Sequence, residues 1–171
     1  MNGEGSPVVE YDQWRWHIEG KFPSDQPPEQ GYVHIGLYLT WLVERDLLDP
    51  AWVRKAEAER IVAAIRAREQ TGCALRDVAQ GSFTDAMLND EGRAFTTAYY
   101  VPEYGYARDY RAIFGRPADD YAVPDGWDSY ERLAPLLDRR YDEWLRAGRP
   151  ELIPMPSLLP RWLGFLRPRS G

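Results

Sequence analysis

The sequence is poor in cysteine, histidine and lysine. Among its 171 residues there is one cysteine, Cys73, and there are two histidines, His17 and His34. A single cysteine excludes an intramolecular disulfide and a cysteine-rich zinc site. Only two of the 21 basic residues are lysines. The chain also lacks a glycine-rich phosphate loop and a G-x-S-x-G element, so nucleotide-dependent and serine-hydrolase chemistry are not expected. No cofactor and no metal ion are predicted.

Basic residues are outnumbered and form no stripe. The chain carries 27 acidic and 21 basic side chains, a formal charge of −6. Since neutralised phosphates supply most of the affinity for nucleic acids, nucleic-acid binding is not expected. An acidic surface instead favours a basic protein partner. Nothing in the pattern indicates an oligomeric state.

Long apolar runs are absent as well. The most apolar stretch, Val33 to Val43, is followed by Glu44-Arg45-Asp46 and is too short to span a bilayer. No transmembrane segment is therefore predicted. The first seven residues have neither a basic region nor an apolar region of the kind that begins a secretory signal. These two features predict a cytoplasmic protein.

The pattern that is present is mostly helical. Apolar residues make up 44% of the chain and charged residues 28%, which is typical of one globular domain. We predict a mainly α fold: a single compact helical domain, with a small β element near the N-terminus in the aromatic segment 11–20. The predicted divisions are a flexible N-terminus at 1–8, the helical domain at 9–148, and a proline-rich tail at 149–171 that packs back on the domain.

Apolar spacing and capping residues give the expected helices. A central helix is expected at 32–48 because it is apolar on nearly all sides. Asp49-Pro50 is a typical helix start, and Asn89 is another. Pro135 is expected to kink the last helix or to restrict its regular part. Trp16, Trp41 and Trp144 are predicted to be buried core residues. The full set of expected helices is 32–48, 50–70, 74–79, 82–88, 90–100, 106–114 and 128–147.

Four sequence blocks occur together in order. They are Trp16-His17-Ile18-Glu19-Gly20-Lys21-Phe22-Pro23, His34-Ile35-Gly36-Leu37-Tyr38-Leu39-Thr40-Trp41, Phe83-Thr84-Asp85-Ala86-Met87-Leu88-Asn89-Asp90-Glu91-Gly92, and Leu136-Leu137-Asp138-Arg139-Arg140-Tyr141-Asp142-Glu143-Trp144. The first three resemble W-H-x-x-G-x-F-P, H-I-G-x-x-L-x-W and F-T-D-x-x-L-N-x-E-G. In this the chain is similar to an uncharacterised bacterial family classed as a domain of unknown function. The resemblance implies no reaction and no catalytic residues.

Candidate catalytic residues are His17, His34, Asp85 and Glu91, because two imidazoles with a carboxylate can bind a metal ion or transfer protons. The simpler interpretation of each histidine is a structural one, bonded to backbone or carboxylate. Helix capping explains Asp85 and Glu91 equally simply, since acidic residues stabilise the first turn of a helix.

Candidate partner-binding residues are Tyr104, Tyr106, Trp162 and Phe165. Because no complete catalytic set is present, the leading hypothesis is a non-enzymatic protein-binding module, such as an immunity-type inhibitor of a bacterial toxin. The alternative is a small enzyme or metal-binding protein that uses His17, His34 and carboxylates of the 85–91 segment. Convergence of both imidazoles and a carboxylate at a cleft would favour this alternative.

Overall fold

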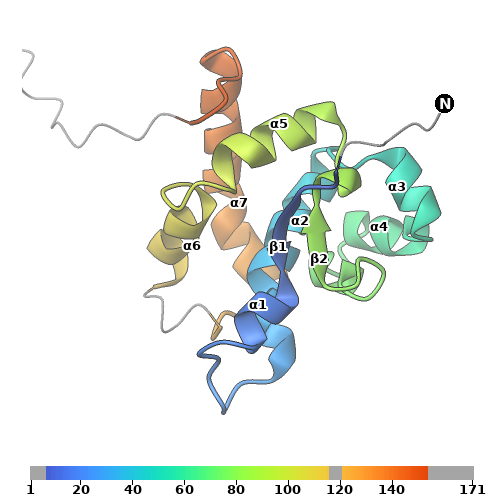
Figure 1. Cartoon of the computed structure of the whole chain (residues 1–171), viewed down its shortest axis with the longest axis vertical. Helices are drawn as coiled ribbons and strands as arrows, with labels where there is room; N and C mark the ends of the chain where they lie inside the picture. The colour runs from blue at the N-terminus through green and yellow to red at the C-terminus, as the bar shows by residue number, and fades with distance from the viewer. Residues whose placement is uncertain (1–6, 116–120, 154–171) are drawn as a thin grey trace, which may run out of the picture.

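The computed structural model describes residues 7–115 and 121–153, and these form a mainly helical domain with one two-stranded sheet (Figure 1). The prediction of a mainly α fold with a small β element near the N-terminus is therefore confirmed. In chain order the elements are β1 (Glu10–Gln13), α1 (Trp14–Ile18), η1 (Pro28–Tyr32), α2 (Val33–Glu44), α3 (Pro50–Lys55), α4 (Glu59–Arg66), η2 (Gly72–Leu75), β2 (Ser82–Thr84), η3 (Asp85–Met87), α5 (Asp90–Tyr99), α6 (Tyr106–Phe114) and α7 (Trp127–Arg146), where η marks a 3-10 helix.

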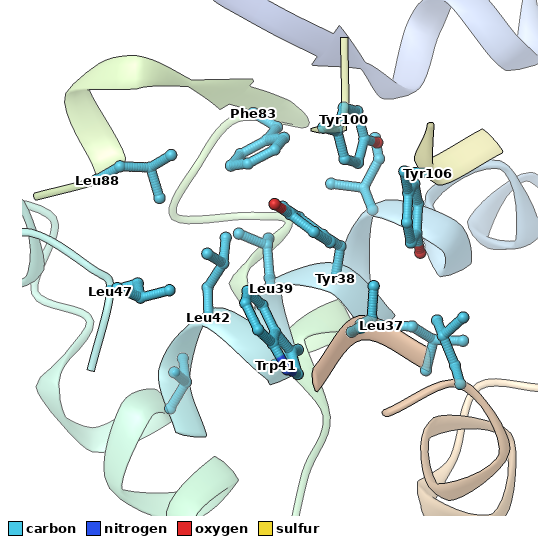
Figure 2. Packing of buried hydrophobic residues seen from close by; sticks show 14 of the residues in the cluster. Leu37, Tyr38, Leu39, Trp41, Leu42, Leu47, Phe83, Leu88, Tyr100 and Tyr106 are labelled. Carbon is cyan, nitrogen blue, oxygen red and sulfur yellow. The ribbon is translucent and has the colours of Figure 1, made fainter. Parts of the chain in front are cut away.

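Helix α2 is the centre of the core, as the apolar run predicts. Every residue from Ile35 to Val43 is buried. Tyr38 stacks on Trp41 of the same helix and lies among three rings from other segments, with centroid distances of 5.8 Å to Phe83, 4.9 Å to Tyr100 and 5.0 Å to Tyr106. Figure 2 shows these rings above α2, with leucine side chains around them. The packing joins α2 to the sheet and to the segment between α5 and α6.

Helix α2 also approaches η2 very closely. A Cβ atom added at Gly36 would lie 2.2 Å from Cys73 Sγ. Thr40 Oγ1 donates to the Gly36 carbonyl at 2.9 Å and accepts from the Gly72 amide at 2.7 Å. Glycine is required here because any side chain would force the two segments apart.

The sheet corrects the predicted helix at 82–88. Residues 82–84 form β2, antiparallel to β1, with Asp12 opposite Phe83 and Gln13 opposite Ser82. Phe83 is fully buried while its two neighbours are only partly covered, which is the alternation of a strand. Only residues 85–87 are helical, as the single 3-10 turn η3.

The helix predicted at 50–70 is two helices, α3 and α4. Glu57 between them has φ of 55°, in the left-handed region. Its neighbour Ala58 is fully buried and donates its amide to the Val53 carbonyl at 2.9 Å, which ends α3. Of the helix predicted at 74–79, only residues 74 and 75 are helical, as the end of η2, and the rest is a turn. The helix starts at Asp49 and Asn89 are confirmed, because each side chain accepts from amides of the first turn.

The C-terminal helix α7 is continuous from Trp127 to Arg146. Pro135 lies inside it on the exposed side and does not end it. Of the predicted tail, the structure describes residues 149–153. Within it, Ile153 is buried and its amide donates to the Ala98 carbonyl at 3.3 Å. No helix in the two described ranges is long and apolar enough to cross a membrane.

Candidate metal centre

The two histidines converge on Asp12, a carboxylate at the end of the β1 strand. β1 passes directly into α1, and the Gln13 side chain caps that helix by accepting from the Arg15 amide at 3.4 Å. This turn brings Asp12 and His17 to the same side of the chain. His34 comes from the first turn of α2. Three elements close to the N-terminus, β1, α1 and α2, therefore supply the cluster.

Both oxygens of the Asp12 carboxylate contact an imidazole. His17 Nε2 lies 2.7 Å from Oδ1, and His34 Nε2 lies 3.1 Å from Oδ2. Two further donors hold the carboxylate in place: the Gln13 amide at 2.8 Å from Oδ1 and the Tyr100 hydroxyl at 2.7 Å from Oδ2. The carboxylate is thus fixed by groups from four parts of the chain.

The two imidazole rings are adjacent and differently oriented. Their centroids are 4.3 Å apart and their planes make an angle of 70°. The His17 side chain is 24% exposed and that of His34 16%. His17 Nδ1 also lies 3.2 Å from the Tyr121 hydroxyl. Both rings are accessible enough for a small ligand while being held by neighbours.

Asp12 stays ionised although it is largely buried. Burial by itself raises the pKa of this carboxyl group, but hydrogen bonds from His17 and His34, together with the charges of these histidines, outweigh it. They hold the pKa of Asp12 well below its usual range. A buried carboxylate that keeps its charge at neutral pH is suited to bind a cation.

A pocket of about 530 Å³ opens directly over the cluster. Asp12, His17 and His34 line it, and its other walls are mostly aromatic. Trp16 and Val101 also line it, and they are 57% and 55% exposed. The prediction that Trp16 is a buried core residue is therefore wrong, whereas Trp41 and Trp144 are buried as predicted. Since Trp16 immediately precedes His17 in the short helix α1, it lies at the surface when His17 faces Asp12.

The carboxylates of the 85–91 segment lie elsewhere. Asp85 accepts from the Val9 amide at 3.0 Å at the end of the sheet. Glu91 accepts from the Tyr141 hydroxyl and forms an ion pair with Arg149 at 2.9 Å. The structure therefore brings together His17 and His34 of the four sequence candidates, and it replaces Asp85 and Glu91 by Asp12.

Asp12 carries no local signal of this role. The sequence shows only an acidic residue in an aromatic segment, five positions before His17. Its burial depends on the pairing of β1 with β2, which lies about 70 residues later in the chain. One general clue was available. An aspartate in a strand that packs on a core is buried, and a buried carboxylate needs hydrogen-bond donors or a cation nearby.

The predicted partner-binding residues divide into two groups. Tyr104 is half-buried in the loop before α6. Tyr106 is buried, donates its hydroxyl to the His34 carbonyl at 2.6 Å, and lines the pocket over the cluster. Trp162 and Phe165 lie outside the described residues. Tyr106 thus supports the backbone that carries His34.

The donor set fits a divalent transition metal. Three ligand atoms, one from each of Asp12, His17 and His34, lie within 4.8 Å of one another. In a tetrahedral zinc site with bonds of about 2.0–2.2 Å, ligand atoms are about 3.4 Å apart. The Nε2–oxygen distances of 2.7 and 3.1 Å are shorter than this, so the side chains would have to move apart, with both Nε2 atoms unprotonated, to admit an ion. Tyr100 and the Gln13 amide would orient the carboxylate from outside, as hydrogen-bond partners of metal ligands commonly do.

Comparison with known proteins gives a family. A family model described as a domain of unknown function (DUF7832) matches residues 10–123. This range contains all three residues of the cluster. No curated protein and no solved structure matches the chain.

Proposed function

This chain belongs to the DUF7832 family, a domain of unknown function, and we propose that it binds one divalent transition-metal ion of the zinc type through Asp12, His17 and His34. One observation carries the proposal: the only two imidazoles of the sequence meet a buried, ionised carboxylate at the base of an open pocket. The carboxylate is Asp12 and not one from the 85–91 segment. The meeting of both imidazoles with a carboxylate is nevertheless what distinguishes a binding site from two separate structural histidines.

The choice of metal follows from the ligands. Imidazole nitrogens with one carboxylate suit zinc and neighbouring transition metals, whereas magnesium and calcium prefer sites made of oxygen. Three protein ligands leave a coordination position for water or a substrate, as in catalytic zinc sites. Since the pocket leads to this position, a small molecule would reach the metal directly. When bound, the metal would polarise a carbonyl or phosphoryl group or activate a water molecule.

The role of the chain's own residues follows from their contacts. Asp12 would carry the negative charge that offsets the metal, and the Tyr100 hydroxyl would fix its orientation. The Tyr121 hydroxyl, 3.2 Å from His17 Nδ1, would fix the ring of His17 in the same way. The Tyr106 hydroxyl would hold the His34 backbone. Contacts of this kind orient metal ligands from outside the coordination sphere.

Binding to a basic protein partner, with the immunity-type role as its specific form, stays a second hypothesis. The acidic composition supports it, and the exposed Trp16 and Val101 add an apolar area at the pocket mouth. The metal proposal ranks first because it explains why three polar side chains from separate elements are arranged around one point. The partner hypothesis gives no reason for that arrangement.

Zinc titration of untagged, chelator-treated protein by isothermal calorimetry tests the metal proposal. We expect one zinc ion per chain, and almost no binding in Asp12→Asn or His34→Gln. Glu91→Gln is the matched control, because it neutralises a carboxylate that the sequence alone made a candidate but that lies with Tyr141 and Arg149. Zinc binding that is absent from the wild type, or unchanged in both cluster variants, would contradict the proposal.

A further inference from the structure

A second pocket, of about 520 Å³, lies between η1, the 69–76 segment and the start of α7. No residue in the described part of the chain lines both this pocket and the one over the candidate metal centre. The second pocket is therefore a separate feature, and a ligand could bind there whether or not a metal ion is bound at Asp12.

Three side chains that line this second pocket have buried polar atoms without a hydrogen-bond partner among the described residues. They are Gln30 Oε1, Tyr32 OH and Trp127 Nε1. The Tyr32 side chain is almost fully buried, at 1% exposure. Buried polar groups in proteins are nearly always paired, and an unpaired one is unfavourable. Three unpaired polar atoms around one pocket indicate that a ligand enters the pocket and pairs with them.

The three atoms together define what such a partner must offer. Gln30 Oε1 needs a donor and Trp127 Nε1–H needs an acceptor, while the Tyr32 hydroxyl can take either role. The complementary group therefore carries both a donor and an acceptor. A carboxamide or the edge of a heteroaromatic amide has this arrangement. A carboxylate does not, because it only accepts.

The charges around the pocket also disfavour an anionic ligand. Glu29, Glu69 and Asp125 line it, with Arg76 as the one basic side chain among the described residues of its lining. Arg76 is already engaged, since it donates to Asp77 at 3.1 Å and lies 3.7 Å from Glu29. The excess of negative charge repels anions and is compatible with neutral or cationic molecules.

The walls favour a flat molecule. The rings of Tyr32 and Trp127 line the pocket together with Val33 and Ala74. The Arg68 guanidinium lies over the Trp127 ring at 4.1 Å, and the Tyr130 ring meets it edge-on at 5.2 Å.

We propose that this pocket binds a neutral or cationic, flat small molecule through a carboxamide-type edge. Its acceptor pairs with Trp127 Nε1–H, and its donor pairs with Gln30 Oε1. Tyr32 OH completes the set. All three polar atoms are buried, so these side chains have to rotate before the atoms can meet the ligand.

Nicotinamide and nicotinate form a matched pair of probes, because they share a ring and differ in whether the edge is an amide or a carboxylate. Titration of the full chain is followed by the indole N–H signals in ¹H–¹⁵N spectra, with the Trp127 signal assigned from Trp127→Phe. We expect nicotinamide to shift the Trp127 signal and nicotinate to bind at least about tenfold more weakly. The indoles of Trp41 and Trp144 donate to Asp138 and to the Pro150 carbonyl, so their signals should not move.

Two variants separate the pairing from general packing. Tyr32→Phe removes the hydroxyl and Gln30→Met removes the amide group, while both keep the approximate shape of the wall. Each should weaken nicotinamide binding about fivefold to tenfold. Without ligand, Tyr32→Phe should unfold at the same temperature as the wild type or higher, because it removes an unpaired hydroxyl. A Trp127 signal that does not respond to nicotinamide would overturn the proposal. Equal responses to nicotinamide and nicotinate, or unchanged affinity in both variants, would overturn it as well.

Discussion

The ion pair of Asp109 with Arg140 joins α6 to α7, and its removal should strongly destabilise the domain. Asp109 is buried, at 3% exposure. It accepts from Arg140 Nε at 2.6 Å and from the second Arg140 nitrogen at 3.1 Å, and the Tyr99 hydroxyl donates to it at 3.2 Å. Arg108 also donates to Asp109, at 3.1 Å. Although burial raises the pKa of Asp109, the hydrogen bonds and charges of Arg140 and Arg108 outweigh it and keep the pKa below its usual value.

Asp109→Asn keeps the shape of the side chain but removes its charge and one acceptor oxygen. The Arg140 side chain, 13% exposed, would then be left without its main counterion. Removing one partner of a buried ion pair costs about 3–5 kcal/mol. We expect a loss of about 3 kcal/mol, the lower end of that range, because Arg140 keeps its contact with Glu143 at 3.1 Å. For a chain of this size, this corresponds to a fall in Tm of about 6–12 °C.

Urea and thermal unfolding of the two proteins measure this loss. Asp142→Asn is the control, because Asp142 is 55% exposed and lies 3.9 Å from Arg146. An exposed pair of this kind contributes about 0.5 kcal/mol or less. If Asp109→Asn costs no more than Asp142→Asn, the ion pair does not hold α6 to α7 and the reasoning is refuted.

The same pair gives a pH dependence with a defined sign. Because the pKa of Asp109 is lower in the folded chain, the unfolded chain binds more protons once the pH falls below about 4. The stabilisation from Asp109 is therefore complete at neutral pH and is lost as the pH falls through the folded pKa. The difference in unfolding free energy between wild type and Asp109→Asn should narrow over that range.

Four further substitutions test the packing and the start of α5. Trp41→Ala should lower the free energy of unfolding in urea by about 3–5 kcal/mol. Trp16→Ala should change it by no more than about 0.5 kcal/mol, because Trp16 is exposed. Equal effects would contradict the assigned burial of the two side chains. Gly36→Ala places a Cβ against Cys73 and should lower the free energy of unfolding by about 1–3 kcal/mol or prevent folding. A variant as stable as the wild type would show that α2 and η2 are not in close contact. Asp90→Asn, at the start of α5, should lose about 0.3–1 kcal/mol, a difference that high salt should reduce.

Local chemistry was sufficient to predict several helix starts. The side chain of Asp49 accepts from the Ala51 amide at 2.6 Å, and that of Asn89 accepts from the Gly92 amide at 2.8 Å. Both contacts join residues within one turn, so the sequence pattern contains all that determines them. The central helix was also predictable. A helix that is apolar on nearly all sides is stable only when other elements pack around it, which places it in the core.

Long-range pairing explains the errors. Ser82 to Thr84 form a strand because β1 lies beside them, and nothing within the segment itself indicates that neighbour. The break at Glu57 is stabilised by burial of Ala58, without the glycine that usually marks a left-handed turn. The candidate site depends on the same kind of information. His17 and His34 could be selected because they are rare, but Asp12 becomes their partner only through the sheet.

Zinc anomalous diffraction tests the central claim most directly. Crystals of the full chain grown with zinc would be measured on both sides of the zinc absorption edge. We expect one strong anomalous peak at bonding distance from Asp12, His17 and His34, with the open side of the metal facing the pocket. A zinc peak at other residues would contradict the proposed metal site. So would a structure at saturating zinc in which Asp12, His17 and His34 keep their direct hydrogen bonds and bind no zinc.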